Sequence, residues 1–197
     1  MTSQKFEGWR KNLYKELVAA YTYYHIWEQL WPSKEHVQVL NRFQVFFHYT
    51  TAAHMQQFIL SMTKITEHRK DSINLWRWLD GIEDDPSLTL RLSTEVKKFR
   101  AQLQTHKDVL QRIRKYRNKV IAHVDERHAW PDNNLWQDKV ITVGEAKALL
   151  QDLESGFNAL SAAYDRHHCL LKTVGLEDTS YLFKELLGKP TLEDFKS

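Results

Sequence analysis

The chain has 197 residues, 42% of them hydrophobic and 27% charged, and this balance predicts one globular domain, 1–197, with a well-buried core. Its net charge of +3 is too small to identify a nucleic-acid partner, and its single cysteine excludes an intrachain disulfide. Because no apolar run reaches the roughly 20 residues of a membrane helix and no signal-peptide stretch opens the chain, we expect a cytoplasmic protein without a membrane partner.

Long helices are predicted by the low counts of glycine, 6, and proline, 4, and by the spacing of apolar side chains. The first helix occupies the region 1–33 and ends at Pro32, because proline disfavours a helical residue before it. A second long helix is predicted from Glu35 to Glu67. Asp71 is placed to cap a short third helix, which ends near Gly81.

The next helical segment begins at Asp85, an N-cap residue followed by Pro86 at the first helical position. The apolar spacing that follows continues to Val124 and fits either one helix or two helices with a kink. Two polar residues, His106 and Arg117, interrupt its apolar stripe.

The C-terminal part of the chain contains a predicted loop and two further helices. The loop covers 126–141. Thr142 and Glu145 fit a capping box that opens a helix extending to Cys169. A short C-terminal helix and tail are expected over 178–197. The elements together predict an all-α fold, an antiparallel helical bundle of four to five main helices.

Arg117 is the polar residue with the clearest chemical potential. A buried arginine without a partner costs several kcal/mol, so it must reach solvent, pair with a carboxylate of another helix or bind an anion. His123 titrates near neutral pH and can exchange a proton with a ribose hydroxyl, and Asn118 can hold either group. Residues six apart on a helix are rotated by about 120° and separated by about 9 Å. Arg117 and His123 can therefore flank one phosphate only if the helix end distorts or a second copy contributes.

Four cations surround this segment: Arg112, Arg114, Lys115 and Lys119. They form a patch that suits an RNA backbone. The alternative is a solvated helix face, because cations also favour helix C-termini. DNA binding through a recognition helix is disfavoured, since such helices use their N-terminal residues.

Residues 117–123, which read Arg-Asn-Lys-Val-Ile-Ala-His, resemble the motif of the HEPN superfamily (higher eukaryotes and prokaryotes nucleotide-binding). Its members carry an arginine, about four to six intervening residues and a histidine, commonly with a polar residue directly after the arginine. The wider run 116–125 and the upstream segments 75–80 and 86–88 are similar to the Abi-U type, the branch linked to phage abortive infection.

The resemblance implies a helical homodimer that brings two motifs into one cleft and cuts RNA without a metal or cofactor, through attack by the 2′-hydroxyl. His123 would be the general acid or base, Arg117 the phosphate binder and Asn118 a positioning residue. Such a ribonuclease would act as a toxin or phage-defence effector, in some cases with an antitoxin partner.

The alternative is a non-catalytic HEPN dimer that binds a nucleotide, RNA or a protein. An open, positively charged cleft around Arg117 and His123 would favour the enzyme, and a buried ion pair of Arg117 would favour the binding protein.

A metal site is the main chemical rival, because the chain contains 10 histidines. The densest cluster is His167-His168-Cys169, but adjacent helical residues diverge by about 100° and do not converge on one ion. We therefore expect no metal site.

Overall fold

The computed structural model describes residues 2–30, 34–118, 141–168 and 176–188. These residues form eight α-helices and no strand, so the predicted all-α fold is confirmed. In chain order the helices are α1 (Ser3–Leu30), α2 (Lys34–Arg42), α3 (Gln44–Thr66), α4 (Leu75–Glu83), α5 (Pro86–Thr105), α6 (Lys107–Tyr116), α7 (Val143–Asp165) and α8 (Leu176–Leu187). No described helix is both long enough and apolar enough to cross a membrane.

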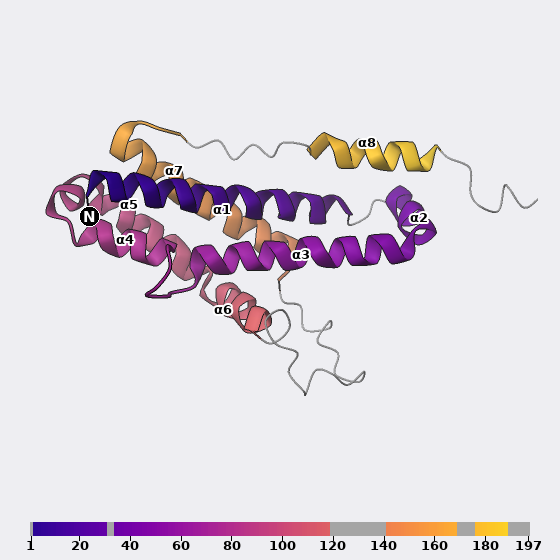
Figure 1. The fold of residues 1–197 in the computed structure, drawn as a ribbon, viewed down its shortest axis with the longest axis horizontal. Helices are drawn as coiled ribbons and strands as arrows, with labels where there is room; N and C mark the ends of the chain where they lie inside the picture. Colours follow the sequence, from indigo (N-terminus) through magenta and orange to yellow (C-terminus); the bar gives the residue numbers. More distant parts are fainter. Residues whose placement is uncertain (1, 31–33, 119–140, 169–175, 189–197) are drawn as a thin grey trace, which may run out of the picture.

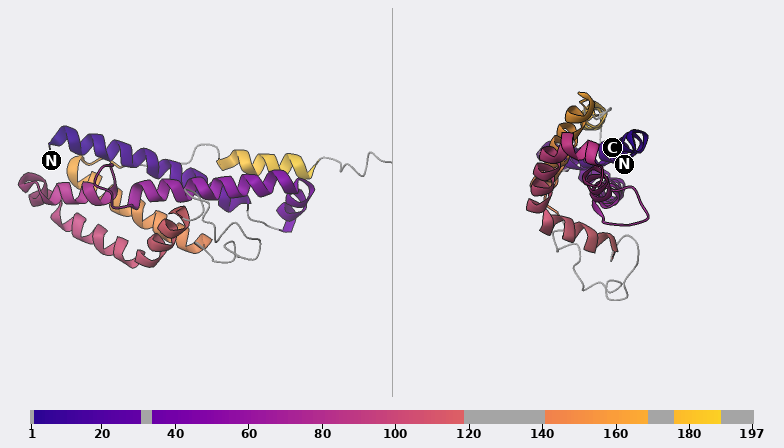
Figure 2. Two further views of the ribbon diagram at one scale, coloured as in Figure 1. Left: turned by 60° about the horizontal axis from the view of Figure 1, so that its bottom comes forward. Right: turned by 90° about the vertical axis from the view of Figure 1, so that its left-hand side faces the viewer.

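The four long helices build the bundle. α1 and α3 lie side by side and run in opposite directions (Figure 1). α7 crosses behind α1 in this view and packs along α5. α6 leaves the end of α5 and lies against α3, while α8 lies near α2 at the opposite end from the N-terminus (Figure 2). The helix that carries Arg117 at its end is therefore attached to the bundle through α3 and α5.

The main core lies between α1, α3, α4, α5 and α7. Most of its members are leucine, isoleucine and valine, and they follow the apolar spacing of the helices. Its largest fully buried members are Phe6, Tyr24, Phe58, Trp78 and Phe99. α5 and α7 approach closely at Gly156, where an added Cβ would overlap the ring of Phe99.

A second, smaller core joins the far ends of α1, α2, α3 and α8. It consists of Leu30, Val39, Phe47 and Phe183, all buried. α8 begins at Leu176, two residues before the segment 178–197 in which the C-terminal helix is predicted. Burial of Phe183 against the other three residues explains why this segment is held to the bundle.

The predicted helix from Glu35 to Glu67 is wrong, because the structure contains two helices there. The break lies at Phe43, whose φ of −121° and ψ of 44° leave the helical region. The break lets α2 turn so that Val39 packs with Phe47 of α3 in the second core. Phe183 of α8 joins Val39 and Phe47 in this core, so a contact with a distant part of the chain overrides the local helical pattern.

Asp71 is not the cap of the short helix. Asn74 caps α4: its side chain accepts a hydrogen bond from the backbone N–H of Arg77 at 3.1 Å, and it is completely buried. Asp71 instead pairs with Arg69 in the exposed loop. The cap thus lies directly before the helical turn that enters the core through Leu75 and Trp78.

Of the two alternatives for the segment after Pro86, the structure shows two helices with a kink, and Asp85 is the N-cap of the first, α5. His106 separates α5 from α6, with φ of −97° and ψ of 10°. Its Nε2 lies 2.7 Å from Oδ2 of Asp152 on α7. This polar contact places the buried imidazole on the apolar side of the bundle without leaving it unpaired.

The capping box predicted at Thr142 and Glu145 is confirmed, with both of its hydrogen bonds present. α7 ends at Asp165, and Arg166 takes a left-handed conformation with φ of 63°. The predicted extension of this helix to Cys169 is therefore wrong, because residues 166–168 are not helical. Cys169 itself lies outside the described residues, as does most of the predicted loop.

Candidate site at the end of helix α6

Arg117 lies directly after α6, where the backbone continues in a π-helical turn through Asn118. Its Nη2 donates a hydrogen bond to Oε2 of Glu67, the C-cap residue that directly follows α3. The exposed fractions of the two side chains are only 19% and 13%. The charge of Arg117 is thus met by a carboxylate from another helix, one of the outcomes that its place on the apolar stripe predicted.

Glu67 faces two arginines. Its Oε1 lies 3.6 Å from Nε of Arg114, whose side chain is mostly exposed. A carboxylate at a helix C-terminus is disfavoured by the helix dipole, and the two guanidinium groups offset this effect. One carboxylate between two guanidinium groups leaves a local charge of +1. Within the described residues, Nε of Arg117 is buried and has no hydrogen-bond partner, so this guanidinium retains an unused donor.

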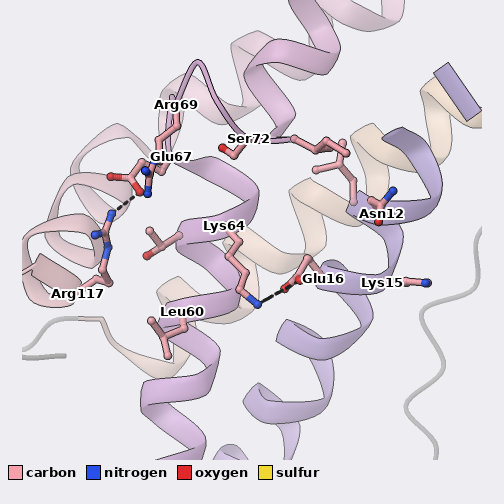
Figure 3. A pocket seen from close by; sticks show the side chains of 12 residues that line it. Asn12, Lys15, Glu16, Leu60, Lys64, Glu67, Arg69, Ser72 and Arg117 are labelled. Carbon is pink, nitrogen blue, oxygen red and sulfur yellow. Dashed lines mark hydrogen bonds and ion pairs between the residues drawn. The ribbon is translucent and has the colours of Figure 1, made fainter. Parts of the chain in front are cut away.

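Arg117 lines a cavity of about 470 Å³ between α1, α3 and the segment that follows α3. We call it the Arg117 cavity. Its charged lining consists of Lys15, Glu16, Lys64, Glu67, Arg69 and Arg117. Figure 3 shows the Arg117–Glu67 pair on one side of the cavity and the Lys64–Glu16 pair on the other. Lys15 is directed away from both pairs.

A second cavity, of about 380 Å³, lies on the side of Glu67 that faces α5 and α6. Trp76 and Arg114 line it together with Leu103, Leu110 and Ile113. The Trp76 indole N–H donates to the Thr66 carbonyl at 2.6 Å, which fixes the ring against the end of α3. Glu67 therefore separates two hollows, and the guanidinium groups of Arg117 and Arg114 lie on either side of it.

The predicted RNA-binding residues fall in different surroundings. Arg112 makes a bidentate pair with Glu145 at the start of α7, at 2.5 and 3.4 Å. This pair comes first among the causes that lower the pKa of Glu145 to about 2. Arg114 and Lys115 are exposed.

Asn118 is exposed beside Arg117, whereas Lys119 and His123 lie outside the described residues. The described part of the motif thus consists of the adjacent residues Arg117 and Asn118, and whether His123 lies near them stays a prediction.

Among the described residues, no group of three or more His, Cys, Asp or Glu could hold a metal ion. His167 is instead exposed and lies 3.5 Å from the carboxylate of Asp165.

Sequence reasoning missed Glu67, the residue that orients Arg117. A weak signal was present, because Glu67 is an acidic residue at the predicted C-terminus of a helix, where the dipole favours a cation. Nothing local indicated which helix end it would meet, since 50 positions separate it from Arg117.

The whole chain was also compared with known proteins. No curated protein and no solved structure matched it. One family model did, that of the HEPN proteins described as AbiU2, over residues 3–181. The match includes α1 through the first part of α8, together with the motif 117–123 and Glu67. Since it spans most of the chain, the protein belongs to the AbiU2 family of HEPN proteins.

Proposed function

We propose that the protein is a metal-independent endoribonuclease that acts as a toxin or phage-defence effector. The observation that carries this proposal is that Arg117, although paired with Glu67, lines a cavity whose charge balance is positive. Glu67 orients it at the end of α6, it lines a cavity with three further cations, and its Nε is buried without a partner in the described residues. A preorganised guanidinium in a positive hollow is suited to bind a phosphate as charge develops on it.

In the proposed reaction, the ribose 2′-oxygen attacks the adjacent phosphorus while its proton passes to a histidine. The bond from phosphorus to the 5′-oxygen breaks, and that oxygen receives a proton, which leaves a 2′,3′-cyclic phosphate and a 5′-hydroxyl. We assign the proton transfers to His123, phosphate binding to Arg117 and positioning to Asn118. Arg117 has five donors, so contact with Glu67 leaves others for the phosphate.

The test is cleavage of total RNA in excess EDTA by the wild-type protein and by H123A, R117A and K97Q. Lys97 is an exposed lysine of α5, and its substitution controls for loss of one positive charge. We expect cutting by the wild type and K97Q, cyclic phosphate ends, and loss of cutting in the other two variants. Cleavage that survives both H123A and R117A would assign the activity to another site or to a contaminant.

A second candidate function is a non-catalytic HEPN protein that binds a nucleotide, RNA or a protein. The observation that favours it is the ion pair itself, because Glu67 already occupies Arg117 and both side chains are largely buried. The cleavage assay separates the two candidates. RNA binding by the wild type without cutting, under conditions that keep the protein folded, would support the binding protein.

Both candidate functions require a homodimer. The ribonuclease also requires a site composed of residues from both copies, and in some settings an antitoxin protein would block it. Dimerisation would place a second copy of 117–123 opposite the first. Light scattering tests this: one chain has a mass of 23.5 kDa, and a dimer would have about twice that mass. A solution mass of a single chain that still cuts RNA would exclude the composite site.

A further inference from the structure

We propose that the Arg117 cavity binds a second phosphate of the RNA strand, next to the phosphate held by Arg117, through Lys64 and Arg69. This inference rests on the proposed function in one respect only, that the ligand is RNA. It assigns a binding role to residues of α3 and of the segment after α3, which lie more than 40 positions before the motif in the sequence.

The charges of the cavity favour an anion. Its lining contains four cations, Lys15, Lys64, Arg69 and Arg117, and two carboxylates, Glu16 and Glu67, which gives a balance of +2. The chain as a whole has a net charge of only +3. The lining stays net positive, at +1, even without Lys15, which is directed away from the other charged side chains, and a concave positive surface attracts a polyanion more strongly than scattered surface cations do.

Lys64 and Arg69 can exchange their present partners for a phosphate at little cost. Lys64 Nζ lies 3.2 Å from Glu16, with the two side chains 63% and 35% exposed. Arg69 lies 3.2 Å from Asp71, with exposed fractions of 56% and 70%. Exposed pairs of this kind contribute about 0–1 kcal/mol.

The Glu67–Arg117 pair is far less exposed, so the same ligand would leave it intact. The cavity thus combines one fixed guanidinium with two cations that are free to move.

The size and remaining lining of the cavity fit part of a nucleotide. A volume of about 470 Å³ falls within the usual range of small-molecule sites. Leu60 and Ile73 supply apolar surface, and Ser72 supplies a hydroxyl group. Ile73 is partly exposed, so a ribose or base that covers it would remove apolar surface from water.

The experiment measures binding of a short single-stranded RNA whose 2′-oxygens are methylated, so that it cannot be cut. Affinity is recorded over a series of salt concentrations for the wild type, K64Q, R69Q, R117Q and K97Q. Each phosphate contact with a single strand contributes about 0.7 to the slope of log affinity against log salt. We expect K64Q and R69Q each to lower that slope by about 0.7. We expect K97Q to keep the wild-type slope, although it removes the same charge.

A charge-preserving variant, K64R, separates binding from folding and is expected to restore the slope. If R117Q lowers the slope but K64Q and R69Q match K97Q, the second phosphate site is wrong while the proposed function stands. If K64Q and R69Q lower the slope but unmodified RNA is never cut, the second site stands and the ribonuclease is wrong. A wild-type protein that does not bind the methylated RNA overturns the second site.

Discussion

The ion pair between Glu67 and Arg117 is expected to be one of the strongest charge interactions in the described part of the fold. Two unit charges about 4 Å apart attract by about 4 kcal/mol at an effective dielectric constant of 20. Partial desolvation, with exposed fractions of 13% and 19%, offsets part of this attraction. We therefore expect a coupling free energy of about 2 kcal/mol. A double-mutant cycle of E67Q and R117Q, measured by urea unfolding, tests this value.

The Glu16–Lys64 pair is the matched control, because it also joins two helices but is much more exposed. A cycle of E16Q and K64Q should give a coupling of at most about 0.5 kcal/mol. If the Glu67–Arg117 coupling is as small as the control, Glu67 does not orient Arg117. The proposal would then lose its preorganised phosphate-binding group, whatever the outcome of the RNA assays.

Three further predictions concern stability. G156A should lower the free energy of unfolding by about 1–3 kcal/mol, because the new methyl group meets the Phe99 ring; an unchanged urea midpoint would refute that close approach. N74A should cost about 1–2 kcal/mol, since it removes a buried helix cap, and thermal unfolding measures this. The pKa of Glu145 is lowered from 4.5 to about 2, first through Arg112, so its stabilising effect is complete above about pH 4.5 and is lost as the pH falls toward 2. In R112Q that acid-dependent loss should shrink by about 1 kcal/mol, a value reduced for solvent screening, and a wild-type pH profile in R112Q would contradict the assignment.

Most of the helices could be predicted from the sequence because their signals are local. Asp85 before Pro86 and the Thr142–Glu145 capping box each fix a helix start within a few residues. The break at Phe43 could not be predicted in this way. It depends on Val39 and Phe47 meeting Phe183, which lies well over 100 positions further along the chain.

In the candidate site, too, the residues with a local signal could be predicted and those that depend on distant contacts could not. Arg117 stood out because a charged residue on an apolar stripe is a local anomaly, and Asn118 because it directly follows Arg117 in the motif. Glu67 did not, since the identity of its partner follows only from the packing of α6 on α3. The pairing of Arg112 with Glu145 was missed for the same reason: its sequence context is that of a basic helix end, and only the fold brings α7 beside it.

Because the helix breaks at His106, a change of angle there would move the far end of α6 more than its start. α6 has 10 residues, so Arg117 lies about 16 Å along its axis from the break. A tilt of about 10° at His106 would therefore displace the backbone of Arg117 by about 3 Å, the length of a hydrogen bond. The contact between His106 and Asp152, at the start of α6, thus bears directly on where the helix places Arg117, although both residues lie at the other end of the helix from it.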